Sequence, residues 1–103
     1  MTLARTGRAS GIALAVLLSA CGRPQSIPVD IKQFAYVPAR VQAHEGDTLV
    51  FTNHDIVPHT ATARDKSWDS GTIAPEGVQR VVVTGPGEFF CTFHPNMIGA
   101  VAK

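Results

Sequence analysis

The sequence predicts a small all-β protein, an antiparallel sandwich or barrel, and three observations support this. Short runs alternate between apolar and polar residues, as at positions 29–31 and 49–51, which is the pattern of a half-buried strand. Clusters of turn-forming residues separate these runs about every 8–12 residues, a spacing typical of small antiparallel sandwiches. After residue 27 no run has the apolar periodicity of a helix.

The expected strands can be placed along the chain in order. Alternation marks strands around residues 29–31, 41–43, 49–51 and 81–83. Turns between them are marked by Pro, Gly and Asp, at residues 37–38, 45–47, 69–71, 75–77 and 85–87. Residues 64–77 form the least regular part, and we expect them to loop across one edge of the sheets.

The first 20 residues are predicted to be a secretory signal peptide. They hold Arg5 and Arg8, no acidic residue, and an apolar run at 12–18, which is the usual order of regions in such signals. The apolar run is too short to cross a bilayer, which needs about 20 apolar residues. Without these 20 residues the chain of 103 has 83, with seven basic and eight acidic residues, so the formal net charge changes from +1 to −1.

Size and charge exclude several classes of protein. A chain of 103 residues is too short for a multi-domain enzyme or a membrane-spanning transporter. A nearly neutral chain without basic runs gives no electrostatic reason to bind nucleic acid. We therefore expect one domain at 27–103, preceded by a signal at 1–20 and a short tether at 21–26.

The segment Leu18-Ser19-Ala20-Cys21 resembles the bacterial lipobox, in which the cysteine is acylated and becomes the mature N-terminus. The resemblance implies that Cys21 carries a lipid, and that the protein is exported and held to a membrane on its periplasmic or outer face. The alternative is an ordinary signal cleavage, which would leave Cys21 and Cys91 free to form a disulfide.

A candidate metal site lies near the C-terminus. Cys91, His94 and Met97 recur at intervals of three, and on a strand that runs into a tight loop this spacing lets the three side chains turn toward one point. A thiolate, an imidazole and a thioether form a soft ligand set that favours copper over magnesium or calcium. Considered one at a time, the three residues have simpler interpretations: Cys91 as a buried core thiol, His94 as a surface histidine, and Met97 as a side chain that fills space in the core.

A trigonal copper site needs a second imidazole, and three other histidines are candidates. His59 begins an alternating run after a proline, and a side chain fixed at a strand end is a more rigid ligand than one at the tip of a loop. His44 precedes a Glu-Gly-Asp turn and His54 lies in the loop before His59. We expect His44 and His54 to be solvated, although imidazole could give His54 an auxiliary metal role.

The chain from residue 29 to 103 resembles the cupredoxins, the small blue-copper proteins, and among them the plastocyanin, pseudoazurin and amicyanin group. The segments that carry the resemblance are residues 34–38, 45–53, 58–60, 68–71, 91–97 and 99–101. The resemblance implies a Greek-key β-sandwich and one type 1 copper ion. It also implies the copper ligands, which are His59, Cys91, His94 and Met97.

Two departures from the family pattern concern the surroundings of this site. The strand before Cys91 is two residues shorter than usual, which preserves the alternation that turns Cys91 inward. The residue after the first histidine is Thr60 rather than asparagine. We expect the Thr60 amide to donate a hydrogen bond to the Cys91 sulfur and so to tune the copper.

The cupredoxin resemblance implies that the protein is a monomeric electron carrier and not an enzyme, and the lipobox resemblance implies that this carrier is lipid-anchored. Its partners would be redox proteins, such as a cytochrome c or a dehydrogenase or oxidase, which would dock on an apolar collar of exposed residues around His94. The residues of this collar are Pro58, Phe93, Pro95 and Ile98. Two alternatives are a copper carrier or storage lipoprotein without redox turnover, and a nucleophilic enzyme built on Cys91 and His94.

Overall fold

The structure, a computed structural model, describes residues 22–103. The predicted signal at 1–20 and the predicted lipidation of Cys21 lie outside the described residues. None of residues 22–103 forms a helix long and apolar enough to span a membrane.

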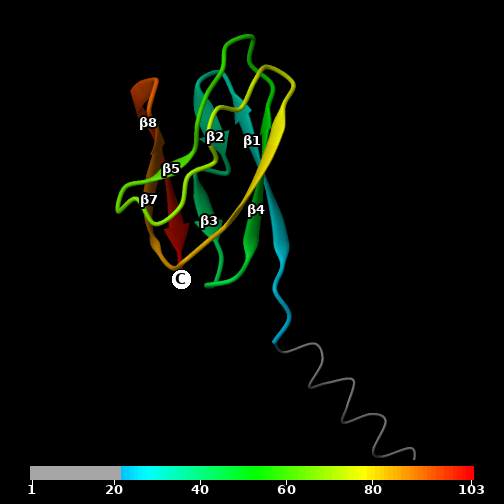
Figure 1. The fold of residues 1–103 in the computed structure, drawn as a ribbon, viewed down its shortest axis with the longest axis vertical. Coiled ribbons are helices and arrows are strands. Elements are labelled where there is room, and N and C mark those ends of the chain that lie inside the picture. Colours follow the sequence, from blue (N-terminus) through cyan, green and yellow to red (C-terminus); the bar gives the residue numbers. More distant parts are fainter. Residues whose placement is uncertain (1–21) are drawn as a thin grey trace, which may run out of the picture.

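Within the described range the chain forms two four-stranded sheets packed face to face (Figure 1). One sheet has the order β2-β1-β4-β6, with β2 Ala35–Val37, β1 Ser26–Lys32, β4 Thr48–Asn53 and β6 Val78–Val82. The other has the order β3-β8-β7-β5, with β3 Arg40–Gln42, β8 His94–Ala102, β7 Gly87–Cys91 and β5 Thr62–Ala63. The all-β sandwich predicted from the alternation is confirmed.

The pairing of the strands is mixed rather than purely antiparallel. β1 pairs with β4 in parallel and β3 pairs with β8 in parallel, whereas the other neighbours are antiparallel. The reason is that the chain leaves the first sheet after β2, forms β3 in the second sheet, and returns as β4 beside β1. Parallel neighbours need such a crossover, and a pattern of alternation carries no information on it.

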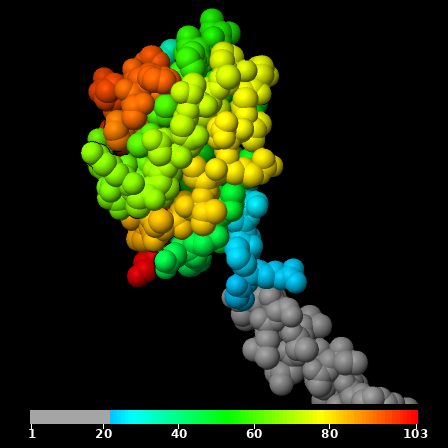
Figure 2. All heavy atoms as spheres, viewed as in Figure 1, coloured from blue at the N-terminus to red at the C-terminus, as the bar shows by residue number. Residues whose placement is uncertain are grey.

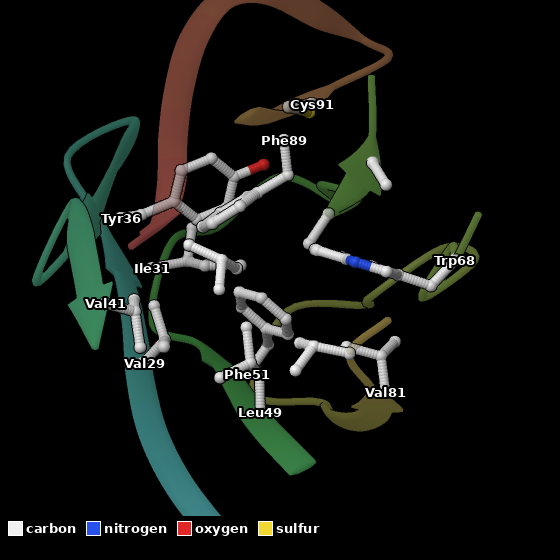
Figure 3. Close-up of a cluster of buried hydrophobic side chains, with 14 of the residues drawn as sticks. Val29, Ile31, Tyr36, Val41, Leu49, Phe51, Trp68, Val81, Phe89 and Cys91 are labelled. Carbon is white, nitrogen blue, oxygen red and sulfur yellow. The ribbon is translucent and has the colours of Figure 1, made fainter. Parts of the chain in front are cut away.

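Aromatic rings fill the centre of the sandwich (Figure 3). Phe89 contacts Tyr36 edge to face with ring centroids 4.7 Å apart, and Phe51 with centroids 5.7 Å apart. Trp68 packs on the same two phenylalanines, at 5.4 Å from Phe89 and 6.3 Å from Phe51. These offset and edge-to-face contacts are the preferred arrangements of aromatic pairs, and Cys91 lies at one margin of the cluster.

One glycine is required by this packing. Gly99 of β8 pairs with Phe89 of β7, and a Cβ atom at position 99 would overlap the Phe89 ring. The absence of a side chain at Gly99 therefore leaves room for the Phe89 ring to lie against β8.

Residues 64–77 contain no strand, as the sequence predicts, but they are not a loose surface loop. Trp68 and Ile73 of this segment are buried in the core. Isolated bridges join Ile73 to His59 and Asp69 to Thr62. The segment therefore pairs with residues 59–62, which follow β4.

The β7–β8 hairpin and the loop after β4 lie at one end of the sandwich. The first described residues and the C-terminus lie at the other end, as Figures 1 and 2 show. The predicted ligands belong to the first of these two ends.

Candidate metal centre

Cys91 and His94 pair across the tip of the β7–β8 hairpin. Phe90 of β7 pairs with Ile98 of β8, but the next residue of β7, Cys91, pairs with His94. Residues 95–97 are therefore extra residues on β8. Such a bulge redirects side chains and often lies beside a functional site. It lets Met97 turn inward, where only 4% of its surface is exposed.

The short strand before Cys91 keeps the expected direction of its side chains. Phe89 and Cys91 are fully buried, whereas Phe90 between them is half-buried. The thiol of Cys91 therefore points into the sandwich, as the alternation predicts. Within residues 22–103 Cys91 is a free cysteine.

His59 is held rigidly beside this thiol. Its backbone N–H donates to the Ile73 carbonyl at 3.1 Å and its carbonyl accepts from the Ile73 N–H at 2.7 Å. The side chain has no exposed surface, and its Nδ1 atom lies 3.7 Å from Cys91 Sγ. The structure thus brings together two residues that are 32 positions apart in the sequence.

Asp55 fixes the other side of the His59 ring. Its Oδ2 atom lies 2.8 Å from His59 Nε2, and its carboxylate also accepts the backbone N–H groups of Gln33 at 2.7 Å and Phe34 at 3.0 Å. Burial would raise the pKa of Asp55, but the hydrogen bonds from Phe34, His59 and Gln33 together outweigh burial and lower that pKa. The sequence analysis missed this residue.

The contact with Asp55 selects one tautomer of a neutral imidazole at His59. An ionised carboxylate has no proton to donate, so the ring proton lies on His59 Nε2 and the Nδ1 lone pair is left free. That lone pair is on the side of the ring that faces Cys91 Sγ. A carboxylate behind a metal-binding imidazole is a common way to orient such a ligand.

Thr60 connects the two segments. Its backbone N–H donates to Cys91 Sγ at 3.3 Å, the contact expected from the sequence. Its carbonyl accepts a hydrogen bond from the Tyr36 hydroxyl, and its Oγ1 atom accepts the Thr92 N–H at 2.9 Å. Burial, and secondarily the nearby Cys91, raises the pKa of Tyr36, so the phenol keeps the proton that it donates.

His94 is half-buried, and its ring centroid lies 5.3 Å from that of His59. Phe34, from the turn between β1 and β2, contacts both rings edge-on, with centroids 5.1 Å from His59 and 4.8 Å from His94. Half of the Phe34 surface is exposed. Phe34 therefore covers the two imidazoles from the solvent side, a role that no local sequence pattern indicates.

Met97 completes the group by its place in the hairpin. It precedes Ile98, the partner of Phe90, and so lies in the bulge opposite Cys91. Among residues 22–103 no three His, Cys, Asp or Glu side chains are gathered closely enough to hold a metal by themselves. His59, Cys91 and His94 are neighbours without forming a closed cage, and a fourth donor from Met97 fits the soft character of the set.

The two remaining histidines lie apart from this group and are solvated, as expected. The His44 side chain is 85% exposed and lies 3.8 Å from Asp47. The His54 side chain is 45% exposed and lies 3.1 Å from Asp30.

The apolar collar expected around His94 is exposed. Phe93 has 48% of its surface exposed and Ile98 has 45%, and Pro58 and Pro95 are also exposed. Phe34 adds to this apolar surface because it contacts the His94 ring. In Figure 2 the hairpin forms a protruding part of the surface beside the loop that follows β4.

No protein-family model matches the sequence, and the search of curated proteins returned no match. Solved structures do match. A reduced proline-to-phenylalanine variant of amicyanin is 27% identical with a TM-score of 0.65, over 75% of this chain and 80% of that one. The Cu(I) form of a methionine-to-alanine variant of amicyanin is 26% identical with a TM-score of 0.66, over 81% and 86%.

An oxidised proline-to-alanine variant of amicyanin is 25% identical, with a TM-score of 0.67 over 75% of this chain and 80% of that one. The chain has the cupredoxin fold. The resemblance stated from the sequence motifs is therefore confirmed for the fold. In this cupredoxin fold, His59, Cys91, His94 and Met97 lie at one end of the sandwich, and their ligation of copper remains a prediction.

Proposed function

We propose that this chain is a type 1 copper protein that carries single electrons between redox partners. The observation that carries the proposal is the buried pair of Cys91 Sγ and His59 Nδ1, 3.7 Å apart, with an oriented imidazole and a backbone N–H aimed at the sulfur. His59, Cys91, His94 and Met97 would hold the metal. Bound copper would supply a one-electron couple between Cu(I) and Cu(II).

The protein's own contribution is a site that needs little rearrangement. Asp55 holds the His59 ring, and the Thr60 N–H stabilises negative charge on Cys91 Sγ. Cys91 and the neighbouring Phe89 ring have no exposed surface, so the sulfur is shielded from solvent (Figure 3). An apolar surround and hydrogen bonds to the thiolate are the means by which a protein tunes such a centre.

Electrons would enter and leave at His94, because it is the half-exposed member of the group. The exposed apolar residues around it, among them Phe93 and Ile98, suit brief docking of a redox protein through a small interface. With a mature formal charge of −1, the chain has little long-range steering, so docking would depend on this apolar surface.

We also propose that Cys21 anchors the protein to a membrane by a lipid, on the strength of its lipobox-like sequence. β1 starts at Ser26 and runs toward the turn that carries Phe34. An anchor before β1 would leave the metal centre at the far end, facing solution. Recovery of the protein in the detergent phase, and its loss from that phase in Cys21→Ser, would test the anchor.

The experiment for the main proposal is to load the protein with Cu(II) and record its optical and paramagnetic resonance spectra, then reduce and reoxidise it. We expect an intense blue thiolate band, reversible bleaching, and no band in Cys91→Ala. A copper adduct that binds but cannot be cycled would favour the carrier or storage alternative. The enzyme alternative is disfavoured because Cys91 is fully buried and out of reach of an acyl substrate.

A further inference from the structure

The backbone ladder between β5 and β7 ends just before the predicted ligands His59 and Cys91. β5 and β7 pair only at Thr62–Phe90 and Ala63–Phe89, so no ladder joins Thr60 to Cys91. On its other side, Cys91 borders the bulge of β8. No regular backbone ladder therefore joins the segment that carries His59 directly to the segment that carries Cys91.

Side-chain hydrogen bonds continue where the ladder stops. Thr60 Oγ1 lies 3.1 Å from Thr62 Oγ1 and 3.2 Å from Thr92 Oγ1, and it accepts the Thr92 N–H at 2.9 Å. Thr62 Oγ1 in turn donates to Asp69 Oδ1 at 3.0 Å, and the same carboxylate oxygen accepts the Gly71 N–H at 2.8 Å.

The carboxylate fixes the direction of every proton in this chain of hydrogen bonds. A hydroxyl has one proton to give, and Thr62 gives it to Asp69. Thr60 must then be the donor to Thr62, and Thr92 the donor to Thr60. Both lone pairs of Thr60 Oγ1 are consequently used by Thr92, one for its hydroxyl and one for its N–H.

We propose that Thr60, Thr62 and Asp69 form a directed relay that positions the hairpin of Cys91 and His94 against the His59 segment. Each hydroxyl that donates toward the carboxylate becomes a better acceptor for the next. The strength of the Thr92 N–H bond therefore depends on Thr62 and Asp69, whose side chains form their hydrogen bonds with Thr60, with each other and with Gly71 rather than with His59 or Cys91. These three are positioning residues, and the inference deepens the proposed function of the same site.

The test uses the full chain without metal, so that it does not depend on copper. NMR-detected hydrogen exchange of the Thr92 amide is compared among variants. Thr62→Val removes the hydroxyl at nearly constant shape and should speed exchange by roughly two- to tenfold, which is the range of net values for one hydrogen bond. Thr62→Ser keeps the hydroxyl and should restore slow exchange.

Two further variants keep the test decisive. Asp69→Asn, at an exposed position, retains an acceptor but loses the charge, so it should give an intermediate rate, because a charge-assisted bond is about twice as strong as a neutral one. Thr84→Val makes the same substitution at an exposed threonine that is bonded to Ser67, and should leave the Thr92 amide unchanged.

Equal exchange rates in Thr62→Val and Thr84→Val would overturn the relay, as would a Thr62→Ser variant as fast as Thr62→Val. If Thr62→Val does not fold, a wild-type rate in Asp69→Asn would overturn it as well. In the copper-loaded protein, Thr62→Val should also slow electron self-exchange. A protein that shows the exchange pattern but never turns blue would retain the relay and lose the proposed function.

Discussion

Two aspartates at opposite ends of β4 make similar contacts in different surroundings. Asp47, just before the strand, accepts the N–H groups of Gln25 at 2.9 Å and His44 at 2.8 Å. Asp55, just after the strand, likewise accepts two backbone N–H groups. Each aspartate also lies beside an imidazole, His44 at 3.8 Å and His59 at 2.8 Å.

The difference is in the histidine. His44 is 85% exposed, whereas His59 has no exposed surface. A water-exposed imidazole can exchange its partner for solvent at little cost, but a buried one needs its hydrogen bond. The same kind of carboxylate contact therefore holds the segment before β1 at the first end of β4, and orients the predicted copper ligand His59 at the second end.

The largest effect should come from removing the histidines themselves. We expect His59→Gly to lose the blue band of the copper-loaded protein, and added imidazole not to restore it, because the His59 site is closed to solvent. His94→Gly should regain the band with imidazole, since His94 reaches the surface. His44→Gly should keep the band without imidazole.

Optical titration with Cu(II), with and without imidazole, measures all three variants. A blue band in His59→Gly without imidazole would contradict the assignment of His59 as a ligand. If imidazole restored the blue band of His59→Gly as readily as that of His94→Gly, the inference that solvent reaches position 94 but not position 59 would be wrong.

The second effect separates the two aspartates. Asp55→Ala leaves the buried His59 Nε2 and the N–H groups of Gln33 and Phe34 without their acceptor. We expect the free energy of unfolding to fall by about 2–3 kcal/mol. Copper affinity should fall by roughly 10–100-fold, which is the usual effect of mutating a residue that hydrogen-bonds to a metal ligand.

Asp47→Ala is the matched control for this prediction. It should lower stability but leave copper affinity within about twofold, because the two sites share no partner. Urea unfolding of the metal-free variants and competition titrations with Cu(II) give the two quantities. Equal losses of affinity in both variants would mean that Asp55 acts only through the stability of the fold.

A third effect is a dependence on pH at the Asp47 end. Hydrogen bonds from the backbone of His44 and then of Gln25 lower the pKa of Asp47 below 3.8. The ionised form is thus favoured in the folded protein, and its contribution to stability is present above pH 3.8 and is lost as the pH falls through the lower, folded value.

The difference in urea midpoint between the metal-free wild type and Asp47→Asn should accordingly be largest near pH 5 and shrink toward pH 2. Asparagine has nearly the same shape, so the comparison isolates the charge. A difference that stays constant over this range would show that the charge of Asp47 contributes nothing.

The sequence was sufficient for the fold class and for the inward direction of Cys91. Alternation at Val29 and Ile31 marks a strand because those side chains face the core. The spacing of Cys91 and His94 was interpreted as a strand that runs into a tight loop, and these two residues pair across the tip of the β7–β8 hairpin. The parallel pairing of β1 and β4 could not be predicted in this way, because it results from a crossover between sheets.

The surroundings of the site were the hardest part to predict. The alternating run after Pro58 favoured His59 among the histidines and the family resemblance implied it, but no local pattern indicates its contact with Cys91, which spans 32 positions. Asp55 was missed because its partners Gln33 and Phe34 lie 22 and 21 positions away and no local pattern joins them. Such contacts depend on how the loops meet after the sheets have formed.

The smallest effect concerns His44, the exposed counterpart of His59. Its Nδ1 atom lies 3.8 Å from Asp47 Oδ2, at the far limit of an ion pair, and exposed pairs contribute between about 0 and 1 kcal/mol. His44→Ala keeps the backbone N–H that Asp47 accepts, so the free energy of unfolding should change by less than about 0.5 kcal/mol. Urea unfolding of the metal-free wild type and variant measures the change. A loss larger than this would mean that the His44 side chain does strengthen the contacts of Asp47, and that the two ends of β4 differ less than their exposure indicates.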